Sequence, residues 1–211
     1  MFTLYYCPGA CSMASHITIE EIGVEYVPQP VLLAKGEHQT PEYLKNVNAR
    51  GKVPALKTDN GVITENVAIL TYLARSFPET QLQPSDPLGL ARCLSHMAYL
   101  SNAVHPAFTR IARTDRFAKD PAAQESVKES ARETFWGLLQ EIDGVVDGNE
   151  WVMGTNYTTC DPYTLVFYGW GARIGLPVTE LKNYTGFKER MLQRPAVRKV
   201  LEREKSALLN A

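Results

Sequence analysis

The chain has 211 residues, of which 45% are hydrophobic and 21% are charged. This length allows one large domain or two modest domains with a substantial buried core, and the composition excludes the disordered and fibrous classes. Its 22 Lys and Arg residues nearly balance its 23 Asp and Glu residues, which gives a formal net charge of -1. Because there is no overall positive field to attract phosphate backbones or anionic lipid, we expect no nucleic-acid partner.

The N-terminus has no basic leader, and no segment approaches the roughly 20 apolar residues of a membrane span. We therefore expect a cytoplasmic protein that does not enter a membrane. Cysteines at positions 7, 11, 93 and 160 are too few and too scattered for a disulfide framework. The cysteines and histidines also lack the Cys-x-x-Cys and His-Glu-x-x-His spacings of zinc sites, so we expect no metal.

The chain opens with a predicted strand, a turn and a helix. Residues 2–6 are apolar and aromatic and end in Pro8-Gly9, which predicts a short strand followed by a turn. Apolar residues then recur at helical spacing over 12–22, and Gly23 follows as a C-terminal cap.

An edge strand is predicted next, over residues 26–31. A β-hairpin follows, with strands at 53–58 and 62–64 joined by the turn Asp59-Asn60-Gly61, and a helix covers 66–76. The two prolines of the 26–31 strand indicate that one edge of this strand is unpaired. The Asn-Gly pair supplies the positive φ angles of a tight turn. Strand, helix, strand, hairpin and helix is the order of a thioredoxin-like domain. We predict such an α/β domain over residues 1–76, small enough to need a partner surface.

Prolines over residues 77–87 predict a linker. Beyond the linker, helical patterns replace the strand and turn signals, and they cover 88–112, 121–146, 161–174, 184–193 and 195–209. Residues 88–211 are therefore predicted to form an all-α domain. Thr158 and Asp161 have the spacing of a capping box, whereas Pro162 favours Asp161 as the cap, and we expect a cap shared between the two.

Cys11 lies between the first predicted strand and the first predicted helix. A thiol at a helix N-terminus meets unpaired N–H groups and the positive end of the dipole, which lower a cysteine pKa from about 8.5 to a range of about 3.5–7.5. We therefore expect a reactive thiol, and the alternative is a small buried residue that fills the turn. Cys7 is interpreted as a strand-end residue, because the redox motif has two intervening residues rather than three.

Two further segments suit a peptide-like ligand. Pro54 opens a strand at the edge where a thioredoxin-like sheet faces its active site, and we predict a cis Val53–Pro54 bond that presents the backbone donor and acceptor of Val53. Glu65 and Asn66 stand at a helix start, where backbone N–H groups bind a carboxylate and Glu65 takes an ammonium. The alternatives are a trans proline in a turn, and a plain N-cap at Asn66 with Glu65 in solvent.

Several segments together form a pattern: Tyr6-Cys7-Pro8-Gly9-Ala10-Cys11-Ser12 with 14–17, then 47–56, 64–69, 104–108 and 157–163. With these segments the chain resembles the beta-class bacterial glutathione transferases over essentially its whole length. The Cys-Ser opening and the histidine early in the second domain are fairly specific to that class. Two positions depart from the pattern: Asn66 stands where serine or glycine is commoner, and Ala49 replaces a usual proline.

The resemblance implies a site for glutathione as substrate, built from both domains of a homodimer's subunit. Cys11 resembles the cysteine that contacts the glutathione sulfur and forms a mixed disulfide with it, with Tyr6 nearby and Ser12 as a further hydroxyl donor. Val53, beside cis Pro54, would give main-chain bonds to the cysteinyl part of glutathione. Glu65 and Asn66 would hold its γ-glutamyl end, and Lys35 would face its glycyl carboxylate. His105 would reach the site from the helical domain.

The predicted function is conjugation of the glutathione thiolate to an apolar electrophile over the helical domain. Aromatic residues of the predicted helices are mostly core, and some are candidates for lining an apolar pocket: Tyr99, Phe108, Tyr163, Phe167, Tyr168 and Trp170. His16, inside the first helix, is interpreted as a packed or capping residue. Two alternatives stay open: thiol–disulfide exchange through Cys11, and a ligand-binding module without catalysis.

Overall fold

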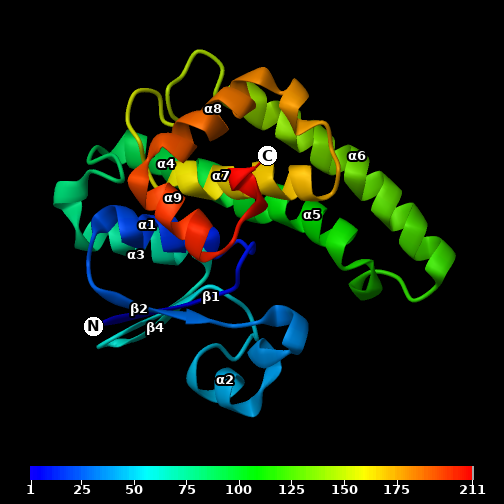
Figure 1. Ribbon diagram of the computed structural model, residues 1–211, viewed down its shortest axis with the longest axis horizontal. Coiled ribbons are helices and arrows are strands. Elements are labelled where there is room, and N and C mark those ends of the chain that lie inside the picture. Colours follow the sequence, from blue (N-terminus) through cyan, green and yellow to red (C-terminus); the bar gives the residue numbers. More distant parts are fainter. Residues whose placement is uncertain (211) are drawn as a thin grey trace.

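The computed structural model describes residues 1–210, which form a four-stranded sheet with its helices and a larger helical part (Figure 1). The first part contains β1 (Phe2–Tyr6), α1 (Met13–Ile22), β2 (Tyr26–Pro30), α2 (Pro41–Asn46), β3 (Ala55–Thr58), β4 (Gly61–Thr64) and α3 (Asn66–Ser76). The helical part contains α4 (Pro87–Tyr99), α5 (His105–Ala112), α6 (Pro121–Val145), α7 (Cys160–Arg173), α8 (Lys182–Gln193) and α9 (Pro195–Arg203). Within residues 1–210, every helix is too short or too polar to cross a membrane.

The sheet has the strand order β2-β1-β3-β4. β1 runs parallel to β2, with Phe2 opposite Tyr26, whereas β3 is antiparallel to both β1 and β4. β2 is therefore an edge strand, which confirms the free edge inferred from its two prolines. α1 and α3 lie on the side of the sheet that faces the helical part, and α2 lies on the other side (Figure 1). This arrangement confirms the predicted thioredoxin-like fold followed by helices.

Local sequence signals place several element boundaries. Gly23 ends α1 in the left-handed conformation, with φ 78°, and its N–H donates to the carbonyl of Ile19. α3 spans the predicted residues, Asn66–Ser76. Gly61, with φ 128°, follows the turn that joins β3 to β4, and a side chain there would be strained.

Several predicted segments differ from those of the structure, and α2 was not predicted. β3 begins at Ala55 because the pairing with β1 ends at Tyr5 opposite Ala55. The helix predicted over 88–112 contains a π-helical segment, Leu100–Val104, directly before α5, where Pro106 has no N–H for the regular bond to the preceding turn. The helix predicted to extend to residue 209 ends at Arg203, since Lys205 adopts a positive φ of 51°.

The start of α7 is capped differently from the predicted box. The Asp161 carboxylate accepts the N–H of Thr158 at 2.7 Å, as expected, and also the N–H of Val152 at 2.8 Å. The Thr158 hydroxyl, however, accepts from the N–H of Cys160 at 3.3 Å rather than from Asp161. Pro162 falls in the first turn of the helix, where backbone N–H groups have no partner within the helix, so the missing N–H of proline costs no hydrogen bond.

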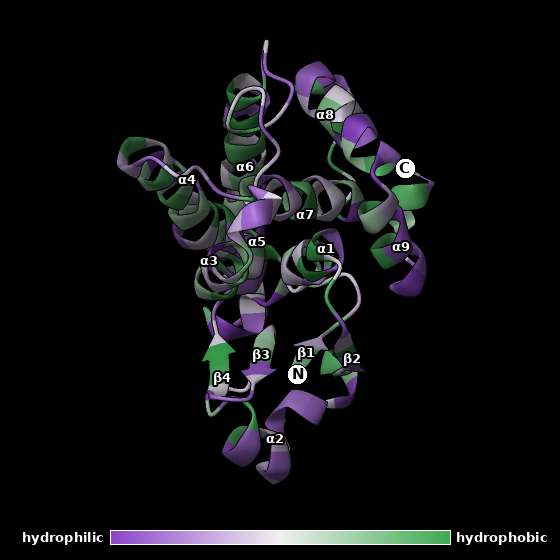
Figure 2. Ribbon diagram, turned by 90° about the vertical axis from the view of Figure 1, so that its left-hand side faces the viewer, coloured by the Kyte–Doolittle hydropathy of each residue, from purple (hydrophilic) through white to green (hydrophobic). Residues whose placement is uncertain are grey.

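The two parts share one hydrophobic core. Met13 and Ile17 of α1 and Leu70 of α3 belong to the same buried cluster as Phe135 of α6 and Phe167 of α7. Figure 2 shows α1 between the sheet and α7, with many hydrophilic residues on the outer helices α8 and α9. Because the sheet buries its helices against the helical part, the small first domain has the partner surface that its size requires.

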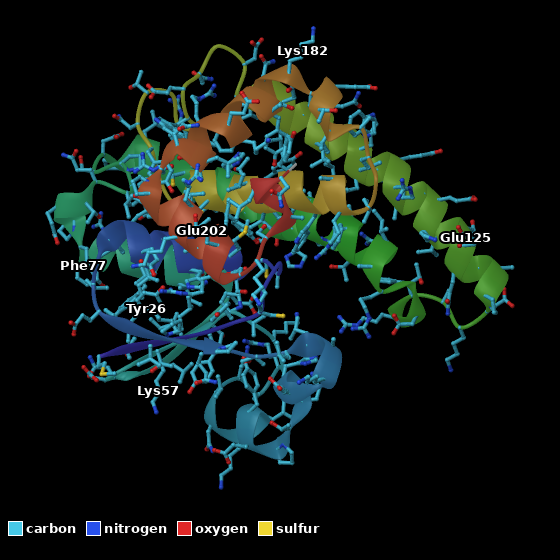
Figure 3. All side chains as sticks on the ribbon, in the orientation of Figure 1. Tyr26, Lys57, Phe77, Glu125, Lys182 and Glu202 are labelled. Atoms are coloured by element: carbon cyan, nitrogen blue, oxygen red, sulfur yellow. The ribbon has the colours of Figure 1, made fainter. Side chains whose placement is uncertain are left out.

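Ion pairs add a polar connection between α1 and the region of α9. Arg194 binds the Glu21 carboxylate through both Nε, at 2.6 Å, and Nη2, at 2.9 Å. Arg203 donates to Glu20 at 2.7 Å and to the Tyr26 hydroxyl at 2.6 Å. Figure 3 shows Tyr26 on the sheet side of α9, the helix that carries Glu202. These contacts fasten the last helix to both α1 and the edge strand.

Candidate active site

Cys11 lies in the loop between β1 and α1, beside the start of β3. Its side chain is half-buried, and its Sγ lies 3.7 Å from the carbonyl oxygen of Val53, to which the thiol donates. The Val53–Pro54 bond is cis, which confirms the prediction. Val53 lies just beyond the last residue pair between β1 and β3. The loop and the Val-Pro segment therefore meet at one end of the sheet, as the sequence predicted.

The structure corrects the expected ionisation of Cys11. Burial raises the pKa of the Cys11 thiol to about 12, and the charge of Glu65 adds to this effect. The backbone N–H groups of Cys11 and Ser12 and the charge of Lys52 lower the pKa, but they do not offset the desolvation. The expectation of a low pKa is thus wrong, because burial outweighs the field of the helix N-terminus. Cys11 is a neutral thiol at neutral pH.

Asn66 holds the Cys11 loop rather than facing solvent. Its Nδ2 donates to the Cys11 carbonyl at 2.8 Å, and its Oδ1 accepts from the Ser15 hydroxyl at 2.7 Å. Asn66 is 6% exposed and Ser15 is fully buried. Because both polar ends of the amide have partners inside the protein, the side chain joins the start of α3 to the start of α1. At this position Asn66 is a positioning residue for Cys11.

Tyr163 of α7 belongs to the same group of residues. Burial is the main cause that raises the pKa of the Tyr163 hydroxyl, and the charges of Cys11 and Glu65 raise it further, whereas a hydrogen bond with Asn66 lowers it. Tyr163 is 1% exposed. From the sequence it was only one of several core aromatic residues, and only the packing of α7 on α1 brings it to Cys11.

Charged side chains surround the opening of the site. Glu65 is the N-cap residue of α3 with a positive φ of 70°, and its exposed carboxylate lies 4.0 Å from Arg50. Lys35 ends a short 3-10 helix and is exposed. Lys52 was not predicted, although it directly precedes Val53-Pro54 in the sequence. Its charge lowers the pKa of both Cys11 and His105.

His105 begins α5 and reaches an aromatic cluster of α7. Its ring centroid lies 4.9 Å from that of Trp170 and 6.3 Å from that of Phe167. Burial, followed by the charge of Lys52, lowers the pKa of His105 to about 4. The imidazole is therefore neutral at neutral pH, with one nitrogen that donates and one that accepts. It lies in the helical part at the start of α5, and its contact with the ligand stays a prediction of the resemblance.

Tyr6 and Ser12 are engaged elsewhere. The Tyr6 ring packs on His16 with centroids 4.4 Å apart, and burial, followed by the charge of Glu204, raises the pKa of its hydroxyl. The Ser12 hydroxyl donates to the carbonyl of Cys7 at 3.2 Å and accepts the N–H of Cys7 at 3.0 Å. Ser12 stands at the N-cap position of α1 without a side-chain capping bond. The Ser12 hydroxyl therefore bonds Cys7 rather than Cys11, and the Tyr6 ring packs on His16.

The helical part holds the peptide groups of Gly9, two residues before Cys11. The Gly9 N–H donates to Glu204 Oε2 at 3.0 Å, and the Gly9 carbonyl accepts from Trp170 Nε1 at 3.0 Å and from Arg173 Nη1 at 3.2 Å. Gly9 has φ 70°, a conformation that favours glycine. No local signal in the sequence indicated this contact, because the partners are 161 to 195 residues away.

A buried histidine orients Glu204 in this contact. His16 Nδ1 lies 2.7 Å from Glu204 Oε1, and both side chains are fully buried. Arg203 Nη1 lies 3.1 Å from His16 Nε2, and since a guanidinium only donates, Nε2 accepts and Nδ1 carries the hydrogen given to Glu204. His16 is thus a packed residue, as interpreted from the sequence. Among residues 1–210 no group of three or more His, Cys, Asp or Glu side chains is arranged to hold a metal ion.

The chain is similar to known glutathione transferases. Residues 1–75 match the family model of the glutathione S-transferase N-terminal domain. The chain is 32% identical to glutathione S-transferase GstA of Escherichia coli O157:H7, over 95% of this chain and 98% of that protein. A glutathione transferase homolog from Sulfitobacter, solved with bound glutathione, superposes with a TM-score of 0.91 at 32% identity, over 96% of this chain and 98% of the other. A beta-class glutathione S-transferase of Sphingomonas chungbukensis gives a TM-score of 0.84 at 32% identity, with the same coverage.

A thioredoxin-like sheet completed by a helical part, with a cysteine at the turn between β1 and α1, defines a class of thiol-binding proteins with two domains. The similarity over nearly the whole chain identifies the family within that class. The chain belongs to the glutathione S-transferase family and is similar to its bacterial members.

We expect Asn66→Ala to lower the free energy of unfolding by about 1–3 kcal/mol, because the Cys11 carbonyl and the buried Ser15 hydroxyl lose their partner. Denaturant unfolding followed by tryptophan fluorescence measures the change. Asn46→Ala is the matched control: the exposed Asn46 amide donates to Glu42 at 2.6 Å, and its loss should change stability by less than about 0.5 kcal/mol. Equal effects of the two substitutions would contradict the positioning role of Asn66.

The pKa of about 4 for His105 in the folded protein predicts a loss of stability in acid. Above pH 6.5 the histidine is neutral in both states; between pH 6.5 and pH 4 it is protonated in the unfolded chain only, so stability falls as the pH falls through this window. We expect His105→Gln to make that decline shallower by about 1–3 kcal/mol, measured by denaturant unfolding at several pH values. His96, whose pKa burial also lowers to about 4, keeps part of the slope in both proteins. An unchanged slope would show that His105 is accessible and titrates normally.

Proposed function

We propose that this protein binds glutathione and conjugates its thiolate to apolar electrophiles, as a glutathione transferase. The observation that carries the proposal is the meeting of Cys11, Val53 and the start of α3 at one end of the sheet, in a chain that superposes on a relative solved with bound glutathione. We assign glutathione binding to residues 1–76, a linker to 77–87, and the electrophile pocket to the helical domain over 88–211.

The proposed site matches each end of a γ-glutamyl tripeptide. The N–H and carbonyl of Val53, beside cis Pro54, pair with the cysteinyl unit in the manner of an added strand. The exposed Glu65 carboxylate takes the α-ammonium, and the first N–H groups of α3 take the α-carboxylate. Lys35 faces the glycyl carboxylate. Asn66 acts through the Cys11 loop, since its side chain is occupied by Cys11 and Ser15.

The chemistry requires the glutathione sulfur as a thiolate next to Cys11. The groups that favour negative charge at this position are the backbone N–H groups of Cys11 and Ser12 and the cation of Lys52. The thiolate attacks the electrophilic carbon, a carbon–sulfur bond forms, and the leaving group departs with the displaced electron pair. Neutral His105, with hydrogen-bonding nitrogens on the helical side, orients the sulfur or the leaving group. Tyr6 and Ser12 are less suited to orient the sulfur or the leaving group.

The lining proposed for the second substrate is aromatic. The rings of Phe108 and Trp170 stack with centroids 4.3 Å apart, and those of Phe167 and His105 lie against Trp170. Such a surface favours an apolar electrophile with a flat ring. Conjugation is favoured over exchange through Cys11 because a thiol with a pKa of about 12 is a poor attacking group at neutral pH.

The biological setting forms part of the same proposal. We assign the protein to the cytoplasm, with detoxification of apolar electrophiles as its role, on its balanced charge and the absence of a membrane-spanning helix among residues 1–210. We also propose a homodimer, in which the sheet domain of one subunit packs against the helical domain of the other.

A Cys11→Ala variant tests the mechanism. We expect it to keep conjugation of glutathione to chlorodinitrobenzene within about tenfold of the parent rate, because Cys11 is not the attacking sulfur. Release of glutathione from a glutathionylated peptide should be lost. Cys7→Ala, which changes the other cysteine of the same loop, should retain both activities. Loss of conjugation in Cys11→Ala alone would assign the chemistry to Cys11, and a parent protein that neither binds nor conjugates glutathione in calorimetry and turnover assays would overturn the function.

Sedimentation velocity at micromolar concentration tests the assembly. We expect a single species of about twice the 23.6 kDa chain mass. A species of monomer mass over the whole concentration range would contradict the homodimer while leaving the glutathione site as proposed.

A further inference from the structure

Cys93 and Cys160 form a close pair of thiols in the helical part, away from the proposed glutathione site. Cys93 lies within α4 and Cys160 is the first residue of α7, and their Sγ atoms are 3.2 Å apart. Both cysteines are free and 0% exposed. The Cys160 thiol is also within 3.4 Å of the Cys93 carbonyl oxygen. The two side chains therefore point toward each other across the contact between α4 and α7.

We propose that Cys93 and Cys160 are an oxidisable dithiol, a modification site at which hydrogen peroxide forms an intramolecular disulfide between α4 and α7. A disulfide has its sulfurs about 2.05 Å apart, so the pair needs to close by only about 1 Å. The burial of both thiols selects a small oxidant: peroxide is about the size of two water molecules, whereas a glutathione disulfide is too large to reach them. The site is thus distinct from Cys7 and Cys11, which are half-buried in the loop between β1 and α1.

The hydrogen bonds around the two thiols differ, which assigns one as the attacking sulfur and the other as the resolving sulfur. The hydrogen bond with Cys160 is the main cause that holds the pKa of Cys93 below its usual value, and the same hydrogen bond, followed by burial, raises the pKa of Cys160. Because the Cys160 thiol also donates to the Cys93 carbonyl at 3.4 Å, Cys93 is, in this proposal, the sulfur that attacks the peroxide. Cys160 is the resolving thiol, already in contact with it.

The reaction balances with peroxide as the sole oxidant. The Cys93 thiolate attacks one peroxide oxygen, the O–O bond breaks, and Cys93 becomes a sulfenic acid with release of hydroxide. The hydroxide takes the proton of Cys160, and the Cys160 thiolate attacks the sulfenic sulfur, which forms the S–S bond and expels a second hydroxide. That hydroxide takes the proton that Cys93 lost on ionisation. Two thiols are oxidised, peroxide is reduced, and two waters leave.

The bridge would join segments that position the proposed active site. α7 carries Tyr163 toward Cys11, and Trp170 and Arg173 onto the Gly9 carbonyl. A covalent bond between residues 67 positions apart constrains the unfolded chain, so the oxidised protein should unfold at a higher temperature than the reduced protein. Reducing agents of ordinary size meet the same burial as bulky oxidants, so the bond should persist while the fold is intact.

The experiment treats the full-length Cys7→Ser/Cys11→Ser protein with excess hydrogen peroxide, with circular dichroism to verify the native fold. Denaturation in iodoacetamide and peptide mapping then follow. We expect both remaining thiols to escape alkylation, a mass lower by about 2 Da, and one linked peptide pair containing Cys93 and Cys160. The parent protein should give the same linked pair, which excludes an effect of the substitutions.

A Cys160→Ser variant assigns the attacking sulfur. Without its resolving partner, Cys93 should accumulate as a sulfenic acid that dimedone labels, whereas Cys93→Ser should give no label at position 160. Three outcomes would overturn the proposal: both thiols alkylated after peroxide treatment of the folded protein, Cys93 oxidised to sulfinic acid without a linked peptide, or a linked peptide only after unfolding. The alkylation, the peptide mapping and the dimedone labelling are all independent of glutathione turnover.

Discussion

The Gly9 peptide, held from two sides by the helical part, is the contact on which the geometry of the Cys11 loop depends. Glu204 takes its N–H, and Trp170 with Arg173 takes its carbonyl. The loop therefore has its shape only when α7 and the end of α9 are in place. The carboxylate that makes the contact is fully buried, and a buried carboxylate is stable only with full hydrogen bonding. His16 and the Gly9 N–H supply that bonding.

A second set of contacts ties the same loop to α3. Asn66 bonds the Cys11 carbonyl, and Tyr163 reaches the group from α7. The loop is thus fixed by α3 on one side and by the helical part on the other, and α1 carries the core that both share. Rigid support of this kind favours a site that positions a thiol and its reaction partner, because misplacement by about 1 Å costs a large part of the rate.

Competition between burial and favourable charge decides the chemistry of Cys11. The helix N-terminus and Lys52 stabilise a negative charge there, but the loss of water around the sulfur is the larger effect. The same position can still favour an anion that brings its own hydrogen bonds, such as the thiolate of a bound tripeptide. The two pairs of cysteines then lie apart: Cys7 and Cys11 belong to the loop between β1 and α1, and Cys93 with Cys160 belongs to the buried core of the helical part.

The sequence by itself determined the order of the four strands with α1 and α3, the two-part fold, the edge position of the strand at Tyr26–Pro30, the ends of α1 and α3, and the cis bond at Pro54, but not the short helix α2. Glycine caps, turn residues, prolines and apolar spacing act over a few residues, so these features can be predicted from local patterns. The resemblance to a family supplied the proposed site residues. Only the tertiary structure decided the pKa of Cys11, the inward side chain of Asn66, the contacts of Gly9 with Glu204 and Trp170, and the pairing of Cys93 with Cys160. These depend on burial and on contacts between residues 51 to 195 positions apart, which leave no periodic signal in the chain.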